Sequence, residues 1–108
     1  MIPTIFKSID PLAVEKSINI LKKGGVIVYP TDTLYGFGVD ANNNYAIERI
    51  NKLKNRHSPM SVIACRFEQA MSWTNIKEKD IEIAKKILNS SSTLILDAKK
   101  NIVSNKIL

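Results

Sequence analysis

One segment near the N-terminus constrains the fold most, because a capped helix and an apolar strand follow each other within a few residues. Asp10 can cap the first amide groups of a helix, and Pro11 suits the first helical position because it lacks an amide hydrogen. An apolar stripe then follows at helical spacing: Val14, Ile18 and Leu21. Gly24-Gly25 provides a left-handed stop, and residues 26–29 are a continuous apolar run that predicts a strand buried on both faces.

A second helix is predicted over residues 41–56. One of the asparagines at positions 42–44 can cap it, and Glu48 and Lys52 form a favourable pair four residues apart. Its buried side is expected to contain Ala46, Ile50 and Leu53.

Helices and strands continue to alternate along the rest of the chain. Residues 60–65 and 92–96 predict strands, and residues 67–73 and 79–89 predict helices. The alternation favours one α/β domain over residues 1–108, without internal repeats or linkers.

Composition excludes several classes of protein. With one cysteine and one histidine, the chain cannot build a zinc site of the usual kind or an internal disulfide. Cys65 is expected to be a reduced thiol in the core, which with the absence of a signal peptide favours a cytoplasmic protein. No apolar run approaches the roughly 20 residues of a membrane helix, so no membrane contact is expected.

The net charge of +6 permits two interpretations. A basic protein attracts polyanions such as nucleic acids and nucleotides at long range. The alternative is an ordinary soluble surface that is rich in lysine.

Hydroxyl groups and glycines are concentrated in residues 29–38, YPTDTLYGFG, directly after the first predicted strand. Thr31, Thr33 and Tyr35 present hydroxyls, while Gly36 and Gly38 let main-chain amides approach a bulky or anionic ligand. Loops at the carboxyl ends of strands are where open α/β folds bind ligands. The segment is therefore a candidate pocket.

A dinucleotide-binding turn and a plain strand-ending turn are the alternatives to a pocket in this segment. Residues 36–41 formally fit the dinucleotide-binding pattern G-x-G-x-x-A, but that pattern must follow a strand directly and open a helix, and three asparagines interrupt any helix here. A turn that simply ends a strand would also contain Pro, Thr, Asp and Gly.

Two cations end the second predicted helix. Lys54 and Arg56 would gain from the helix dipole in any protein. Together with the His57-Ser58-Pro59 turn, they could also clamp a triphosphate.

These motifs together resemble the start of the YrdC/TsaC family of threonylcarbamoyl-AMP synthases. The resemblance rests on KKGGVIVYPTDTLYGFGVDA, IERINKLKNR and PMSVIAC, and covers roughly residues 10–96. It implies a YrdC-like twisted open mixed sheet with flanking helices, incomplete at the C-terminal side.

The resemblance implies a nucleotidyltransferase that forms threonylcarbamoyl-AMP from L-threonine, bicarbonate and ATP, with Mg²⁺ as a companion of ATP. The product serves the t6A modification of tRNA, so downstream t6A-transfer proteins and tRNA or double-stranded RNA are implied partners. The residues implied to bind threonine are Thr33, Thr31 and Tyr35. The residues implied to bind ATP are Lys54, Arg56, Ser58 and Thr93. The resemblance implies that catalysis depends on positioning the substrates. It assigns no residue to a covalent or acid–base step and no residue as a metal ligand.

The chain also departs from the family pattern. The sequence lacks the family's R-x-P and S-x-N motifs. At residues 89–93 it has NSSST, where the family has a P-G-P-x-T turn. These departures predict a truncated or degenerate domain, whose alternative function is non-catalytic binding of nucleotide, double-stranded RNA or tRNA. A carbamoyl-transferring domain of hydrogenase maturation shares the motifs, but its acylphosphatase and zinc-finger companions are absent from this sequence.

Overall fold

The protein is described from a computed structural model of the 108-residue chain, covering residues 5, 7, 10–31, 34–55, 59–90 and 92–107. Its elements are α1 (Pro11–Lys22), β1 (Ile27–Pro30), β2 (Tyr35–Gly38), α2 (Asn44–Lys54), α3 (Phe67–Ser72), a 3₁₀ turn (Glu78–Asp80) and α4 (Ile81–Leu88). They confirm the predicted α/β class. The described residues form a two-stranded antiparallel sheet, and the larger mixed sheet stays a prediction.

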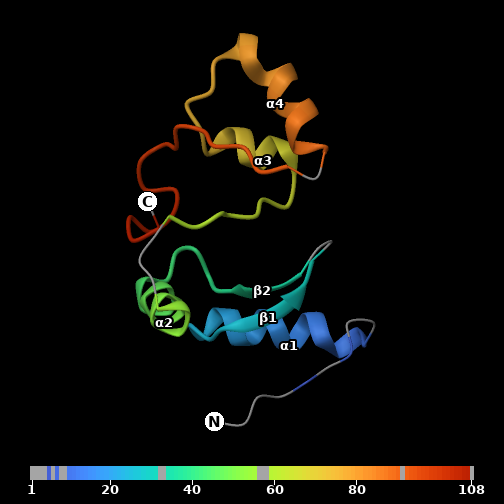
Figure 1. Cartoon of the computed structure of the whole chain (residues 1–108), viewed down its shortest axis with the longest axis vertical. Helices are drawn as coiled ribbons and strands as arrows, with labels where there is room; N and C mark the ends of the chain where they lie inside the picture. The colour runs from blue at the N-terminus through green and yellow to red at the C-terminus, as the bar shows by residue number, and fades with distance from the viewer. Residues whose placement is uncertain are drawn as a thin grey trace.

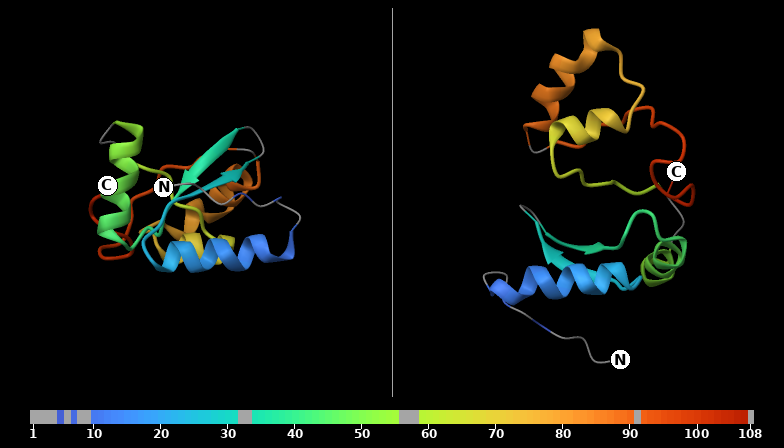
Figure 2. Two further views of the ribbon diagram at one scale, coloured as in Figure 1. Left: turned by 90° about the horizontal axis from the view of Figure 1, so that it is seen from below. Right: turned by 180° about the vertical axis from the view of Figure 1, so that it is seen from behind.

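The elements divide into two parts of an elongated molecule, which measures 49 × 30 × 22 Å. Figure 1 shows α1, the two strands and α2 in one part, and α3 and α4 in the other. The C-terminal segment, coloured red, runs back from the α3–α4 part toward α2, and both views of Figure 2 show the same course.

Helix α1 begins and ends as its sequence predicts. The Asp10 side chain accepts a hydrogen bond from the backbone N–H of Leu12 at 2.9 Å, and Pro11 is the first helical residue. Gly24 has a φ of 78°, the left-handed conformation that a glycine stop provides. The apolar stripe is not buried, since Val14 and Ile18 are both exposed.

Strands β1 and β2 form an antiparallel hairpin, in which Ile27 lies opposite Gly38 and Pro30 opposite Tyr35. The prediction of a strand buried on both faces is wrong, because Val28 is 61% exposed while Ile27 and Tyr29 are half-buried. The residues expected to form only a pocket loop also contribute β2. Antiparallel sheets commonly pack one face on the core and leave the other face in solvent, which agrees with the exposure of Val28.

Helix α2 supplies most of the core. Asn43 caps it, since its side chain accepts a hydrogen bond from the N–H of Ala46 at 3.0 Å. The buried apolar residues of the described chain are Ala46, Ile47, Ile50, Ala84 and Ile107. The prediction for Leu53 is wrong: its side chain is 59% exposed, because it lies in the last turn of α2, beyond the core.

Three predictions in the second half of the chain also need correction. Residues 60–65 and 92–96 are not strands, and Cys65 is exposed rather than in the core. A strand needs a series of backbone hydrogen bonds to a neighbouring strand. These segments make only isolated backbone hydrogen bonds, such as the one from the N–H of Met60 to the carbonyl of Ile107 at 3.3 Å. The predicted helices are confirmed as α3 and α4.

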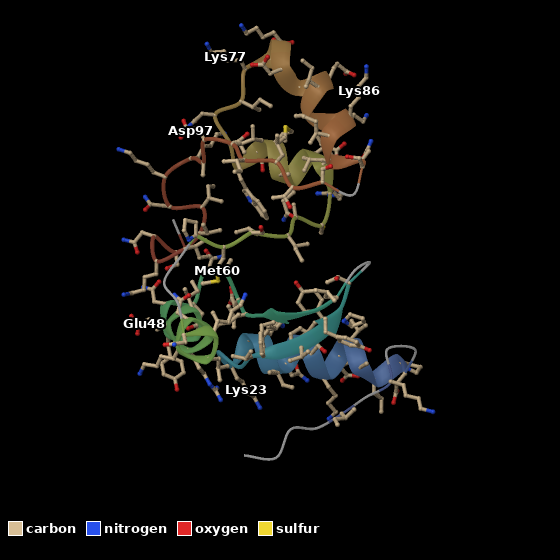
Figure 3. The ribbon with its side chains drawn as sticks, in the orientation of Figure 1. Lys23, Glu48, Met60, Lys77, Lys86 and Asp97 are labelled. Atoms are coloured by element: carbon tan, nitrogen blue, oxygen red, sulfur yellow. The ribbon has the colours of Figure 1, made fainter. Side chains whose placement is uncertain are left out.

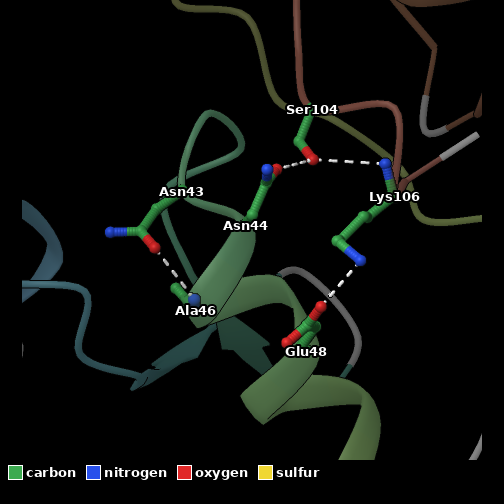
Figure 4. A network of polar contacts seen from close by, with 6 residues as sticks. All are labelled: Asn43, Asn44, Ala46, Glu48, Ser104 and Lys106. Atoms are coloured by element: carbon green, nitrogen blue, oxygen red, sulfur yellow. Dashed lines mark hydrogen bonds and ion pairs between the residues drawn. The ribbon is translucent and has the colours of Figure 1, made fainter.

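The C-terminal segment is fastened to the first half of α2 by polar contacts, shown in Figure 4. The Ser104 hydroxyl donates a hydrogen bond to the side-chain oxygen of Asn44, and Lys106 forms an ion pair with Glu48 at 2.7 Å. The hydrogen bond from Lys106, and then its charge, hold the pKa of the Glu48 carboxyl below its usual value. The main partner of Glu48 is therefore Lys106. The charge of the predicted partner Lys52 also lowers the pKa of Glu48, but less than Lys106 does.

Candidate functional site

The turn of the hairpin holds two of the three residues implied to bind threonine. The N–H of Thr31 donates to the carbonyl of Leu34, and the N–H of Leu34 donates to the Thr31 hydroxyl oxygen, both at 3.1 Å. Tyr35 begins β2 opposite Pro30 and is 75% exposed. Thr31 and Tyr35 thus lie at the same end of the hairpin. Thr33 lies outside the described residues.

Lys54 is the last residue of α2, and its side chain is exposed. Asn55 then ends the helix in the left-handed conformation, with a φ of 51°. Lys52 and Lys54 both lie in the last turn, where the helix dipole favours positive charge. Arg56 and Ser58, the other predicted phosphate contacts of this turn, lie outside the described residues.

Thr93 lies in the extended segment after α4 and is exposed. Its neighbours Leu94 and Leu96 face α4 across a cavity of about 420 Å³, which Ile83 and Ile87 also line. Figure 1 shows this segment, in orange-red, beside α3 and α4, away from the hairpin.

The structure brings together only some of the predicted site residues. Figures 1 and 2 show α2 near one end of the two strands, whereas Thr31 and Tyr35 belong to the end at which Pro30 pairs with Tyr35. Lys54 is the last residue of α2. Neither the 420 Å³ cavity nor a second of about 370 Å³ is lined by Thr31, Tyr35, Lys54 or Thr93. Because Thr33 and Arg56 are not described, their convergence on one cleft stays a prediction.

The positive charge is spread over the surface. Figure 3 shows Lys77 and Lys86 projecting from the α3–α4 part, while Lys23 lies in the other part. Within the described ranges, no three His, Cys, Asp or Glu side chains are grouped closely enough to hold a metal ion. No helix in the described part of the chain is long and apolar enough to cross a membrane.

The contact between the C-terminal segment and α2 has no signal in the sequence. Ser104 and Asn44 are 60 positions apart, and neither belongs to a recognisable motif. Ser104 is buried, at 9% exposure, and its hydroxyl is one of the contacts that join the C-terminal segment to α2. The contact lies at the N-terminal end of α2, and Lys54 is the last residue at the other end of that helix.

Comparison with known proteins supports the motif-based resemblance. Residues 19–108 match the model of the Sua5/YciO/YrdC family, which is described as telomere recombination. No solved structure matches the chain.

The curated relatives include proteins named threonylcarbamoyl-AMP synthase. The protein from Saccharophagus degradans is 41% identical over 54 residues, which are 48% of this chain and 28% of the relative. The protein from Vibrio vulnificus strain YJ016 is 33% identical over 70 residues, 63% of this chain and 38% of the relative. The protein from Pseudoalteromonas translucida is 29% identical over 97 residues, 85% of this chain and 52% of the relative. The chain therefore spans about half the length, or less, of these relatives.

Proposed function

Because this chain belongs to the Sua5/YciO/YrdC family, we propose that it provides the threonine-binding turn and part of the ATP site of a threonylcarbamoyl-AMP synthase. The observation that supports this most is the 41% identity to a protein named threonylcarbamoyl-AMP synthase. The same proposal includes the fold: β1 and β2 are part of a larger twisted mixed sheet of the kind that the family is expected to have.

The proposed reaction is an adenylation. Threonine and bicarbonate first condense to a carbamate, with loss of water. A carbamate oxygen then attacks the α-phosphorus of ATP, a new O–P bond forms, and the bond to the β-phosphate oxygen breaks. Pyrophosphate leaves with the electron pair, so the reaction needs no oxidant or reductant.

The protein's part in this reaction is positioning and charge neutralisation. Thr33 binds the substrate threonine, while Thr31 and Tyr35 shape the same turn. Lys54 and Arg56, next to Ser58, bind the phosphates, and Thr93 contacts the nucleotide. Mg²⁺ enters the proposed reaction as part of the MgATP substrate.

A second candidate is a module that binds a nucleotide, tRNA or double-stranded RNA without turnover. The observation that favours it is the net charge of +6 combined with exposed lysines in both parts of the molecule. Binding of nucleotide without any binding of threonine would support this candidate over the synthase.

Two matched variants test the assignment of the two ligands. Thr33→Val removes one hydroxyl and is expected to weaken threonine binding about 2- to 10-fold, because a typical hydrogen bond contributes about 0.5–1.5 kcal/mol. Thr93→Val is its control, and is expected to weaken MgATP binding by a similar factor while leaving threonine affinity unchanged. Calorimetric titration of each variant with each ligand measures both effects. Equal losses for both ligands in either variant would contradict the assignment.

A further inference from the structure

The two glycines of β2 share one face of the hairpin with an aromatic ring. Because side chains alternate along a strand, the register places Tyr29 on the same face as Gly36 and Gly38. Ile27 completes this face. All four residues of the face are half-buried, whereas the four on the opposite face are exposed. On the half-buried face, β2 therefore contributes no side chain of its own.

The ring of Tyr29 packs directly against these glycines. A β-carbon added to Gly38 would lie 2.9 Å from Cε1 of the ring and 3.2 Å from Cγ1 of Ile27. A β-carbon added to Gly36 would lie 3.6 Å from Cζ of the ring, which is an ordinary van der Waals distance. Neither residue has a positive φ, since Gly24 is the only described glycine that does. Space for the neighbouring side chains, rather than backbone freedom, therefore accounts for a glycine at position 38.

This contact gives the two glycines a different role from the one that the sequence suggests. Gly36 and Gly38 were expected to open the backbone to a ligand, but on this face the ring of Tyr29 already occupies the space next to them. The nearest atoms in both contacts are ring carbons, so a phenylalanine at position 29 would preserve them. The bulky group that the glycines admit is thus a side chain of the hairpin itself.

A ring packed against glycines holds two strands in register. Glycine weakens a strand, because it has no side chain to pack and loses more conformational freedom on folding than other residues do. An aromatic side chain on the neighbouring strand offsets this weakness and helps to pin the register. Within the described chain, β2 bonds only to β1, so no second strand fixes its register there. The ring of Tyr29 is therefore in a position to do so.

The register decides how the turn presents its side chains. Tyr29 pairs with Gly36, and Tyr35 belongs to the next pair, the last before the turn. A slip of one residue would move Tyr35 to the other face of the hairpin. It would also separate the N–H of Thr31 from the carbonyl of Leu34, to which it donates at 3.1 Å.

We propose that Tyr29 is a positioning residue of the threonine-binding turn: its ring packs against the two glycines of β2 and fixes the register of the hairpin. That register holds Thr31 and Tyr35 together at the turn. The identity of the ligand, L-threonine, rests on the proposed function. The contact between the ring and the glycines depends on no ligand, so it is measured separately.

Nuclear magnetic resonance of the full chain tests the contact without a ligand. A nuclear Overhauser effect between the ring protons of residue 29 and the α-protons of Gly38 is expected in the parent chain and in Tyr29→Phe. Exchange of the Thr31 amide hydrogen is expected to be about 2- to 5-fold faster in Tyr29→Val, which is the contribution of one cross-strand aromatic pair. The amide of Ile47, which donates to the carbonyl of Asn43 in α2, is the internal reference and is expected to keep its rate.

Two alanine variants provide a matched pair, because each adds one methyl group to β2. Gly38→Ala places the methyl 2.9 Å from the ring and is expected to speed exchange at Thr31 by a similar factor. Gly36→Ala makes an ordinary contact and is expected to leave that exchange unchanged or slower. The effect of Gly38→Ala is expected to be smaller in the Tyr29→Val background, where no ring has to move. Equal acceleration by the two alanine variants would contradict the contact.

Calorimetric titration with L-threonine tests the link to the ligand. Tyr29→Val is expected to weaken threonine binding about 2- to 5-fold, whereas Tyr29→Phe is expected to bind like the parent chain. Weaker binding by Tyr29→Phe would assign the role to the hydroxyl and overturn the proposal. Absence of the nuclear Overhauser effect in the parent, or equal acceleration at Thr31 and Ile47 in Tyr29→Val, would also overturn it. A parent chain that binds no threonine would contradict the proposed function alone, because the resonance measurements still decide what the ring does.

Discussion

Replacing Ile47 by alanine is expected to lower the free energy of unfolding by about 2–5 kcal/mol. Ile47 is the largest fully buried side chain of the described residues, at 0% exposure, and lies in the first half of α2. Its removal leaves a cavity in a core that has few other members. Native proteins are stable by only about 5–15 kcal/mol, so a loss at the upper end of this range would unfold a marginally stable chain. Urea unfolding followed by circular dichroism measures the effect.

The control for this variant is Leu53→Ala on the same helix. Leu53 is 59% exposed, and surface substitutions usually change stability by less than about 0.5 kcal/mol. A simple helical periodicity would put Leu53 on the buried side and predict a large loss there. Equal losses for the two variants would contradict the exposure of Leu53 at the end of α2.

The chain alone is expected to release pyrophosphate from MgATP at least about 100-fold more slowly than the Pseudoalteromonas translucida synthase assayed beside it. Misplacement of a reacting group by about 1 Å can cost this factor. The described site residues Thr31, Tyr35, Lys54 and Thr93 are all exposed, and no described cavity encloses them. The assay contains threonine and bicarbonate, and a reaction without threonine is the blank.

Threonine-dependent release at a comparable rate would contradict this expectation and make the chain an enzyme in its own right.

The helices were predictable because their ends are set by neighbouring residues. The caps at Asp10 and Asn43 and the left-handed Gly24 each act within a few positions of the helix that they limit. Capping and helix periodicity are local properties, so the sequence contains them directly.

The strands were less predictable because a strand depends on its partner. Residues 60–65 have the apolar character of a strand but no ladder in the structure, whereas residues 35–38 form β2 by pairing with β1. The burial of Cys65 and Leu53 likewise depends on what packs against them. The ion pair between Lys106 and Glu48 joins residues far apart in sequence, and no local pattern announces it.

The candidate site was predictable to the same extent. The compact motif predicted a pocket loop, whereas the structure forms a hairpin from these residues, with Thr31 and Tyr35 at one end of it. Convergence of the turn with Lys54 depends on how α2 is oriented relative to the strands, which is a tertiary property. Thr33, Arg56 and Ser58, on which the motif argument depends most, lie outside the described residues.

The central claim, that this chain contains part of an ATP site, is tested most directly by calorimetric titration with MgATP. Each charge-assisted phosphate contact contributes about 1.5–3 kcal/mol, so Lys54→Ala/Arg56→Ala is expected to weaken binding about 100-fold or more. Lys22→Ala/Lys23→Ala is the matched control, because it also removes two positive charges at the end of a helix. The account predicts that this control binds like the parent chain. Unchanged binding in the Lys54/Arg56 variant, or equal weakening in the control, would contradict it.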